Sequence, residues 1–150
     1  MTSIQIRPLN PADKESWLAL WHGYQRFYKV DLPQATSQVT WQRLLDEHEP
    51  MSCAVAVDAG LPVGIVHFIQ HRSCWTTGDY LYLQDLFVAP ELRGKGVGRA
   101  LIEHVYTQAR ERECSRVYWL THETNHEAML LYDRIAERSG FVQYRKMFSK

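Results

Sequence analysis

The stretch LTHETNH places His122, Glu123 and His126 in the order H-E-x-x-H. On one helix this spacing sets two imidazoles a turn apart beside a glutamate base, the arrangement found in zinc hydrolases. The zinc interpretation needs His122 inside the helix and a third ligand downstream. His122 instead follows directly on the strand-like run VYWL, and Thr121 and Thr124 suit a turn or a cap better than a helix interior. We therefore expect no metal site, and the role of the two histidines stays open.

A second chemical pattern lies at residues 93–98, which read RGKGVG and satisfy R-x-x-G-x-G. Glycines at this point let the backbone approach a bulky anion, while the following helix and the nearby Arg93, Lys95 and Arg99 add positive potential. The P-loop pattern is not satisfied. The loop APELR separates the glycines from the preceding strand, unlike a dinucleotide fingerprint. The turn is predicted to hold a phosphate or pyrophosphate.

The composition limits the partners of such a site. The chain has 150 residues, 45% of them hydrophobic, and 17 basic side chains balance 17 acidic ones. A balanced charge without a basic cluster argues against nucleic-acid binding. The three cysteines form no C-x-x-C pair, which favours a reducing compartment. Without a signal-peptide pattern or a membrane-length apolar run, we expect a cytoplasmic protein with no membrane partner.

The scaffold that must position these residues can be predicted from periodicity. The predicted order is strand 3–7, helix 10–30, helix 36–47, strands 53–57, 63–70 and 80–88, helix 94–112, strand 117–120, helix 125–139 and strand 141–148. This order, β-α-α-β-β-β-α-β-α-β, indicates an α/β fold with a mixed sheet covered by helices, in a single domain over residues 1–150. Residues 80–120 form a β-α-β crossover, so their two strands should be parallel neighbours.

Two stretches carry a family resemblance: YLQDLFVAPELRGKGVGRALI and TNHEAMLLYDRIAERSGFVQYRK. Together with the element order, they resemble the GNAT superfamily of N-acetyltransferases over essentially the whole chain. The closest branch holds the diamine (spermidine/spermine-like) and histone-like acetyltransferases. The resemblance implies an acetyl-CoA-dependent enzyme that transfers an acetyl group directly to a primary amine in a ternary complex. It also implies a homodimer, a small-molecule or lysine-like amine substrate, and a central parallel strand pair that splays apart.

The resemblance further implies which residues bind acetyl-CoA. The backbone of Leu86, Phe87 and Val88 would hydrogen-bond the pantetheine arm, which enters the gap between strands 80–88 and 117–120. The thioester would lie near residues 84–86. The pyrophosphate would be held by amides of the glycine turn: Arg93, Gly94, Lys95, Gly96, Val97, Gly98 and Arg99.

Asn125 and Tyr132 match a second family pattern, an Asn after a strand and a Tyr seven residues later. Seven residues are close to two helical turns, so both side chains can face the cofactor. By the resemblance, Tyr132 is the general acid that protonates the departing CoA thiolate.

The proton acceptor is the point at which the chain departs from the family. An alkylamine is protonated at neutral pH and must lose a proton before it attacks. The resembled branch has Y-L-E-D with Glu as the base, but this chain has YLQD, and Gln84 can position a water or the amine without accepting a proton. Asp85, Asp79 or Glu123 takes over, or the substrate amine has a low pKa. Strand alternation places Asp85 on the face opposite Gln84.

For the substrate, Tyr28 and Asp31 at the exit of the first helix are the candidates to line an amine pocket, with Glu123 as a further candidate. The aromatic stripe that begins at Trp17 has the spacing of a core face, with a cation cage as the alternative. Gln84 also motivates a second hypothesis, a non-catalytic acyl-CoA-binding sensor or partner module. The zinc hydrolase is the third.

Overall fold

The computed structural model describes residues 3–149 and divides the chain into two compact units, residues 1–119 and residues 120–150. The first unit contains β1 (Ile4–Pro8), η1 (Pro11–Asp13), α1 (Lys14–Phe27), α2 (Gln34–Leu45), β2 (Met51–Asp58), β3 (Leu61–His71), β4 (Tyr80–Val88), η2 (Pro90–Leu92), α3 (Val97–Glu111) and β5 (Arg116–Tyr118). The second unit contains α4 (His126–Ile135). Every predicted element before residue 140 is present, with bounds that differ by a few residues. A single domain over residues 1–150 stays a prediction.

The sheet of the first unit has the order β1-β2-β3-β4-β5. The first three pairings are antiparallel, and β4 pairs with β5 in parallel through the α3 crossover. The mixed α/β fold and the parallel pair predicted from residues 80–120 are therefore confirmed.

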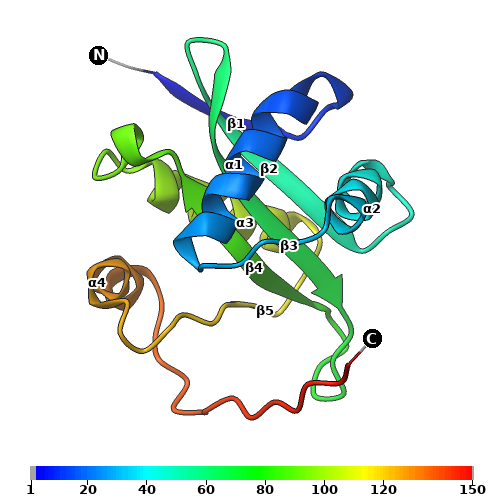
Figure 1. Ribbon diagram of the computed structural model, residues 1–150. Helices are drawn as coiled ribbons and strands as arrows, with labels where there is room; N and C mark the ends of the chain where they lie inside the picture. The colour runs from blue at the N-terminus through cyan, green and yellow to red at the C-terminus, as the bar shows by residue number, and fades with distance from the viewer. Residues whose placement is uncertain (1–2, 150) are drawn as a thin grey trace. The chain divides into compact units, whose positions relative to one another are not determined.

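Helices cover both faces of this sheet, as the neighbouring residues His67 and Phe68 of β3 demonstrate. The His67 ring accepts a hydrogen bond from Trp17 of α1, whereas the Phe68 ring lies 5.4 Å below the guanidinium of Arg112, which caps α3. Successive strand residues point to opposite faces, so α1 and α3 lie on opposite sides of β3. Figure 1 shows α1 and α2 on one side of the sheet and α3 on the other.

The core lies between these layers. The apolar face predicted for the third helix is buried as expected, at Val97, Leu101, Val105 and Ala109. In the strands, side chains of β2, β3 and β4 fill the space on both faces of the sheet. Among residues 3–149, no helix combines the length and the apolar character needed to cross a bilayer.

The parallel strand pair stops early. β5 pairs with β4 only from Tyr80↔Arg116 to Tyr82↔Tyr118, and the remaining six residues of β4 have no pairing on that side among the described residues. The predicted splay between these two strands is therefore confirmed. It leaves the edge of β4 that faces away from β3 without a strand partner after Tyr82, although Val88 O on this stretch accepts a hydrogen bond from Arg93.

A capping box fixes the start of the first helical segment. The Asn10 side chain accepts a hydrogen bond from Ala12 N at 2.9 Å, and the Asp13 carboxylate accepts one from Asn10 N at 2.9 Å. The same carboxylate accepts hydrogen bonds from both terminal guanidinium nitrogens of Arg7, at 2.8 and 2.9 Å. This bidentate pair ties the end of β1 to the beginning of α1.

The second unit corrects one prediction. Residues 141–148 alternate as a strand would, but they form no ladder, so the predicted final strand is wrong. A strand is stable only when its backbone groups pair with a neighbour, and residues 120–149 contain no other strand. The apolar side chains of this segment are exposed: Phe141, Val142, Tyr144, Met147 and Phe148.

Candidate active site

The glycine turn joins β4 to α3 and has the conformation that its sequence requires. Gly94 and Gly96 have φ of 76° and 82°, in the left-handed region that favours glycine. A Cβ at either position would meet no other atom within 4 Å, so the constraint is conformational and the space beside the turn is open. Gly96 is also the N-cap of α3.

The first amides of α3 follow directly on this turn. The first hydrogen bond of the helix runs from Ala100 N to Gly96 O at 3.0 Å. The amides of Val97, Gly98 and Arg99 precede it, and the first amides of a helix have no partner within the helix. Unpaired amides and the helix dipole at a helix N-terminus are features that favour binding of an anion.

The three cations of the turn have different roles. Arg93 Nε donates to Val88 O at 3.0 Å, and its guanidinium lies 5.2 Å from the Phe87 ring centroid and 5.7 Å from that of Phe27. Arg99 Nε pairs with Glu103 at 3.0 Å. Lys95 is exposed and forms no ion pair within residues 3–149. Arg93 is thus fixed to the end of β4, Arg99 is paired with an acidic side chain, and Lys95 is the cation of the turn that is exposed without an ion pair among residues 3–149.

A β-bulge interrupts β4 at Gln84. His67 pairs with Asp85, the next residue Phe68 pairs with Leu83, and Gln84 is left as the extra residue. A bulge changes the direction of the side chains around it. As a result Gln84 and Asp85 line the same pocket, and the prediction that they point to opposite faces is wrong.

This pocket, here called the Asp85 pocket, has a volume of about 280 Å³. Its wall is apolar for the most part and comes from α1, the α1–α2 loop, α2, β2 and β3: Trp21, Leu32, Leu44, Met51, Phe68 and Ile69. Its polar lining consists of Thr40, His67, Gln84 and Asp85, and Asp85 is the only carboxylate among the lining residues.

Asp85 is held by His67, which is held in turn by Trp17. Its Oδ2 lies 2.9 Å from His67 Nδ1, and His67 Nε2 accepts a hydrogen bond from Trp17 Nε1 at 3.0 Å. The Tyr24 and Tyr28 side chains lie close enough to Asp85 for its negative charge to raise their pKa values. The Asp85 side chain is 13% exposed and that of His67 only 4%. The carboxylate is therefore ordered but still reaches the pocket.

The tyrosines beside Asp85 are kept protonated. Burial, followed by the negative charge of Asp85, raises the pKa of Tyr24 far above its ordinary value. The same two causes raise the pKa of Tyr28 and of Tyr82. Tyr24 is thus a hydrogen-bond donor at neutral pH, not a proton acceptor.

Of the other residues in the first unit that are predicted to bind the substrate or act as the base, only Tyr28 lies beside Asp85. Tyr28 packs against Tyr24, with ring centroids 5.0 Å apart, and so borders the Asp85 network. Asp31 is exposed in the α1–α2 loop. Asp79 accepts a hydrogen bond from Gln70 at 2.9 Å and precedes β4, about 17 Å along the strand from Gln84. Asp79 is therefore too far along the strand to replace the family's glutamate.

In the second unit, the predicted residues gather around the start of α4. Asn125 is the N-cap position of α4, and its Nδ2 donates to Thr121 Oγ1 at 3.3 Å. Tyr132 follows about two turns later on the same helix, and Glu123 is exposed in the preceding turn. The spacing of the family pattern is thus retained on one helix.

The H-E-x-x-H stretch does not form a zinc helix. His122 lies in the turn before α4, where its Nδ1 is 2.7 Å from Thr124 Oγ1, and only His126 is helical. The two imidazoles therefore do not share a helix face. Within residues 3–149, no three His, Cys, Asp or Glu side chains are close enough to hold a metal ion.

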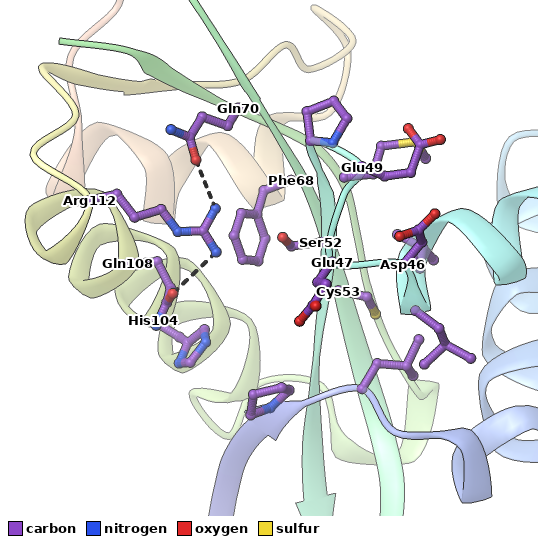
Figure 2. A pocket seen from close by; sticks show the side chains of 16 residues that line it. Asp46, Glu47, Glu49, Ser52, Cys53, Phe68, Gln70, His104, Gln108 and Arg112 are labelled. Carbon is purple, nitrogen blue, oxygen red and sulfur yellow. Dashed lines mark hydrogen bonds between the residues drawn. The ribbon is translucent and has the colours of Figure 1, made fainter.

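A larger hollow, of about 400 Å³, lies elsewhere in the first unit and is drawn in Figure 2. It is bordered by α3 and by the α2–β2 connection, and neither the glycine turn nor Gln84 and Asp85 line it. Arg112 provides the one guanidinium that lines this hollow. It donates hydrogen bonds to the side-chain oxygens of Gln70, at 3.1 Å, and Gln108, at 3.3 Å; Figure 2 draws both bonds. Size alone does not make it the active site.

Sequence reasoning missed His67 and favoured a core role for Trp17 and Tyr24 over a cation cage. One signal was available: His67 interrupts the apolar run VGIVHFI of a predicted strand. A polar side chain buried in that position needs hydrogen-bond partners. The identity of those partners depends on strand pairing and could not be obtained from the spacing.

Comparison with solved structures identifies the class of fold. An aminoglycoside acetyltransferase, AAC(6')-Iy, in complex with a bisubstrate analogue matches with a TM-score of 0.84, at 17% identity, over 98% of this chain and 99% of that one. A ribosomal-protein-alanine N-acetyltransferase from Brucella melitensis matches with a TM-score of 0.78, at 24% identity, over 97% and 100% of the two chains. The fold is that of the acetyltransferases.

Sequence comparison then gives the family. Residues 17–136 match the profile of the Acetyltransferase (GNAT) family. The D-amino-acid N-acetyltransferase HPA3 of Saccharomyces cerevisiae is 37% identical over 145 residues, which cover 95% of this chain and 90% of that protein. A thialysine N-epsilon-acetyltransferase of Caenorhabditis elegans is 24% identical over 135 residues, 90% and 83% of the two chains. The chain belongs to the GNAT family; it is an N-acetyltransferase, and acetyl-CoA is its cofactor.

Proposed function

We propose that this enzyme transfers the acetyl group directly from acetyl-CoA to a primary amine bound in the Asp85 pocket, and that Asp85 accepts the proton of the amine. The observation that supports this most strongly is the position of Asp85. It is the only carboxylate that lines a pocket beside the β4 bulge, where the family resemblance puts the thioester. The sensor hypothesis was motivated by the lack of a carboxylate at Gln84. The carboxylate of Asp85 beside it weakens that reason.

Acetyl-CoA, when bound, supplies the activated acetyl group. The amides of Val97, Gly98 and Arg99 and the ammonium of Lys95 would hold its pyrophosphate, and Gly94 and Gly96 would leave room for it. The backbone of Leu86 to Val88, with no β5 pairing beside it, would bind the pantetheine arm. Arg93 contributes indirectly by fixing the turn to the end of β4.

The protein's own residues would manage two protons. An alkylammonium has a pKa of about 10.4, so the amine enters charged and must become neutral before attack. Asp85 would take that proton, directly or through a water, while Gln84 orients the nitrogen. By the family resemblance, Tyr132 would donate a proton to the CoA thiolate, with Asn125 facing the cofactor.

The lining of the Asp85 pocket also favours one kind of acceptor. A polyamine carries further ammonium groups, and each would need a carboxylate or a polar partner in the pocket. Asp85 is the only carboxylate present among the lining residues, and the rest of the wall is mainly apolar. We infer a small primary amine whose remaining body is apolar. The relatives named for D-amino acids and thialysine also point to small amines.

The assembly and location follow from the resemblance and remain part of the proposal. We infer a homodimer, which the exposed apolar side chains of residues 141–148 support. We infer a cytoplasmic enzyme, in keeping with the free thiols of Cys53, Cys74 and Cys114.

The experiment that tests the function is an amine panel. Purified protein is mixed with acetyl-CoA and each amine, and the release of free CoA thiol is followed. We expect turnover with small apolar primary amines and a much lower kcat/KM with spermidine. Binding of acetyl-CoA without turnover across the panel would establish the sensor instead. Undiminished turnover by Tyr132→Phe would remove the proposed acid.

A further inference from the structure

The hydrogen-bond chain behind Asp85 determines the state of His67. Trp17 is 1% exposed and its Nε1 lies 3.0 Å from His67 Nε2. The indole nitrogen is a donor only, so His67 Nε2 must be the acceptor and carries no proton. If both ring nitrogens were protonated, two N–H groups would face each other across this contact.

The tautomer of His67 therefore follows from its neighbour. A neutral imidazole has one N–H, and with Nε2 bare this proton is on Nδ1. Nδ1 lies 2.9 Å from Asp85 Oδ2, so the ring donates to the carboxylate. The close approach of His67 and Asp85 is thus a hydrogen bond from a neutral ring to an anion, not an ion pair.

This arrangement fixes Asp85 at the bulge. His67 and Asp85 are paired residues on adjacent strands, at the position where the register of β4 shifts. With Oδ2 occupied by His67, the carboxylate cannot rotate freely, and its remaining capacity is directed to Tyr24 and to the Asp85 pocket. A donor that stays neutral also leaves the negative charge of Asp85 uncompensated, which a proton acceptor requires.

We propose that His67, locked by Trp17 in the Nδ1–H tautomer, is a positioning residue that orients the Asp85 carboxylate toward the substrate amine. The proposal rests on the proposed function of Asp85 as the proton acceptor. It gives His67 a role that the packing of a core histidine does not require, since an apolar side chain could fill the same space. The packing of the His67 side chain and its two hydrogen bonds, with Trp17 and Asp85, can therefore be tested separately.

The first measurement is independent of catalysis. In ¹⁵N-labelled full-length protein, the ring nitrogens of His67 are assigned by comparison with His67→Gln. We expect a protonated Nδ1 and an unprotonated Nε2 at neutral pH, and a mixture with the Nε2–H form in Trp17→Phe, where the donor is lost. A wild-type His67 with the proton on Nε2, or on both nitrogens, would overturn the proposal.

The second measurement uses matched variants in the amine assay. His67→Leu keeps much of the volume but removes both polar contacts, and we expect kcat to fall about 10–100-fold with little change in KM for acetyl-CoA. His67→Gln retains a donor and an acceptor and should recover most of the rate. His71→Gln, an exposed histidine on the same strand, is the control and should keep the wild-type rate. Circular dichroism and the unfolding midpoint establish that each variant is folded.

A double mutant separates the two proposals. If His67 acts through Asp85, His67→Leu added to Asp85→Asn should cause no further loss of kcat. Losses that multiply, or a wild-type kcat in folded His67→Leu, would overturn the positioning role alone. An Asp85→Asn variant with an undiminished rate would instead overturn the proposed base, and the positioning role with it.

Discussion

His67 Nδ1 lies 2.9 Å from Asp85 Oδ2 across the bulge that separates the two halves of β4. The contact joins a buried ring to a carboxylate that lines a pocket, and Trp17 determines which ring nitrogen carries the proton. The resembled branch has a glutamate at the position of Gln84. This chain has an aspartate at the next position, Asp85, whose carboxylate contacts His67. If Asp85 accepts the proton of the amine, as proposed, Gln84 is compatible with an active enzyme.

A substitution in the glycine turn is predicted to affect both the stability of the protein and its binding of acetyl-CoA, and a control glycine separates the two effects. Gly96→Ala places a Cβ on a residue with φ of 82°, which should lower the free energy of unfolding by about 1–2 kcal/mol. It should also raise KM for acetyl-CoA, because the turn would relax away from the geometry that binds pyrophosphate. Gly60→Ala is the control, since Gly60 has φ of 79°, open space around it, and a place in the β2–β3 hairpin. Equal effects of the two variants on KM would show that the turn does not bind the cofactor.

The cations of the turn should respond differently to substitution. Arg93→Met removes the hydrogen bond to Val88 O and the contacts with Phe27 and Phe87, so we expect a loss of about 1 kcal/mol in the free energy of unfolding. Lys95→Met should leave stability unchanged and weaken acetyl-CoA binding several-fold at low salt, with a smaller effect at high salt. Urea unfolding and titration calorimetry at two ionic strengths measure both. Binding that is insensitive to Lys95→Met at low salt would contradict the assignment.

The pair of Arg7 and Asp13 predicts how stability depends on pH. The hydrogen bonds from Arg7 hold the pKa of Asp13 below its usual range. A carboxylate with a depressed pKa stabilises the fold above its unfolded pKa of about 3.9, and this contribution is lost as the pH falls through the lower folded value. Asp13→Asn should therefore lower the free energy of unfolding at pH 7 by about 1–3 kcal/mol. The difference from wild type should shrink below pH 4. A difference that stays constant from pH 7 to pH 3 would rule out the ionic contribution.

Local patterns in the sequence predicted the local features well. The glycine turn, the helix start at Asn10 and the buried face of α3 each depend on residues within a few positions of one another. The bulge at Gln84 was not predictable in this way, because it exists only in the pairing of β4 with β3. Alternation along β4 alone therefore placed Gln84 and Asp85 on opposite faces.

Two other features depend on contacts between distant parts of the chain. Trp17 and His67 are 50 residues apart in the sequence, and nothing in either segment specifies the other. The segment 141–148 has a strand pattern but no partner strand in its unit, and a pattern records only which side chains alternate. Side-chain periodicity thus predicts elements, whereas pairing decides whether a strand forms and what a polar residue contacts.

The central claim is that Asp85 accepts the proton of the amine, and one measurement tests it most directly. The rate of CoA release with the best amine of the panel is compared for wild type, Asp85→Asn and Asp79→Asn at neutral pH. Asp79→Asn is the matched control, because this aspartate precedes the same strand and contacts Gln70 instead. We predict that Asp85→Asn lowers kcat by about 10²–10⁴-fold and that Asp79→Asn stays within a few-fold of wild type. A folded Asp85→Asn enzyme with the wild-type kcat would contradict the account.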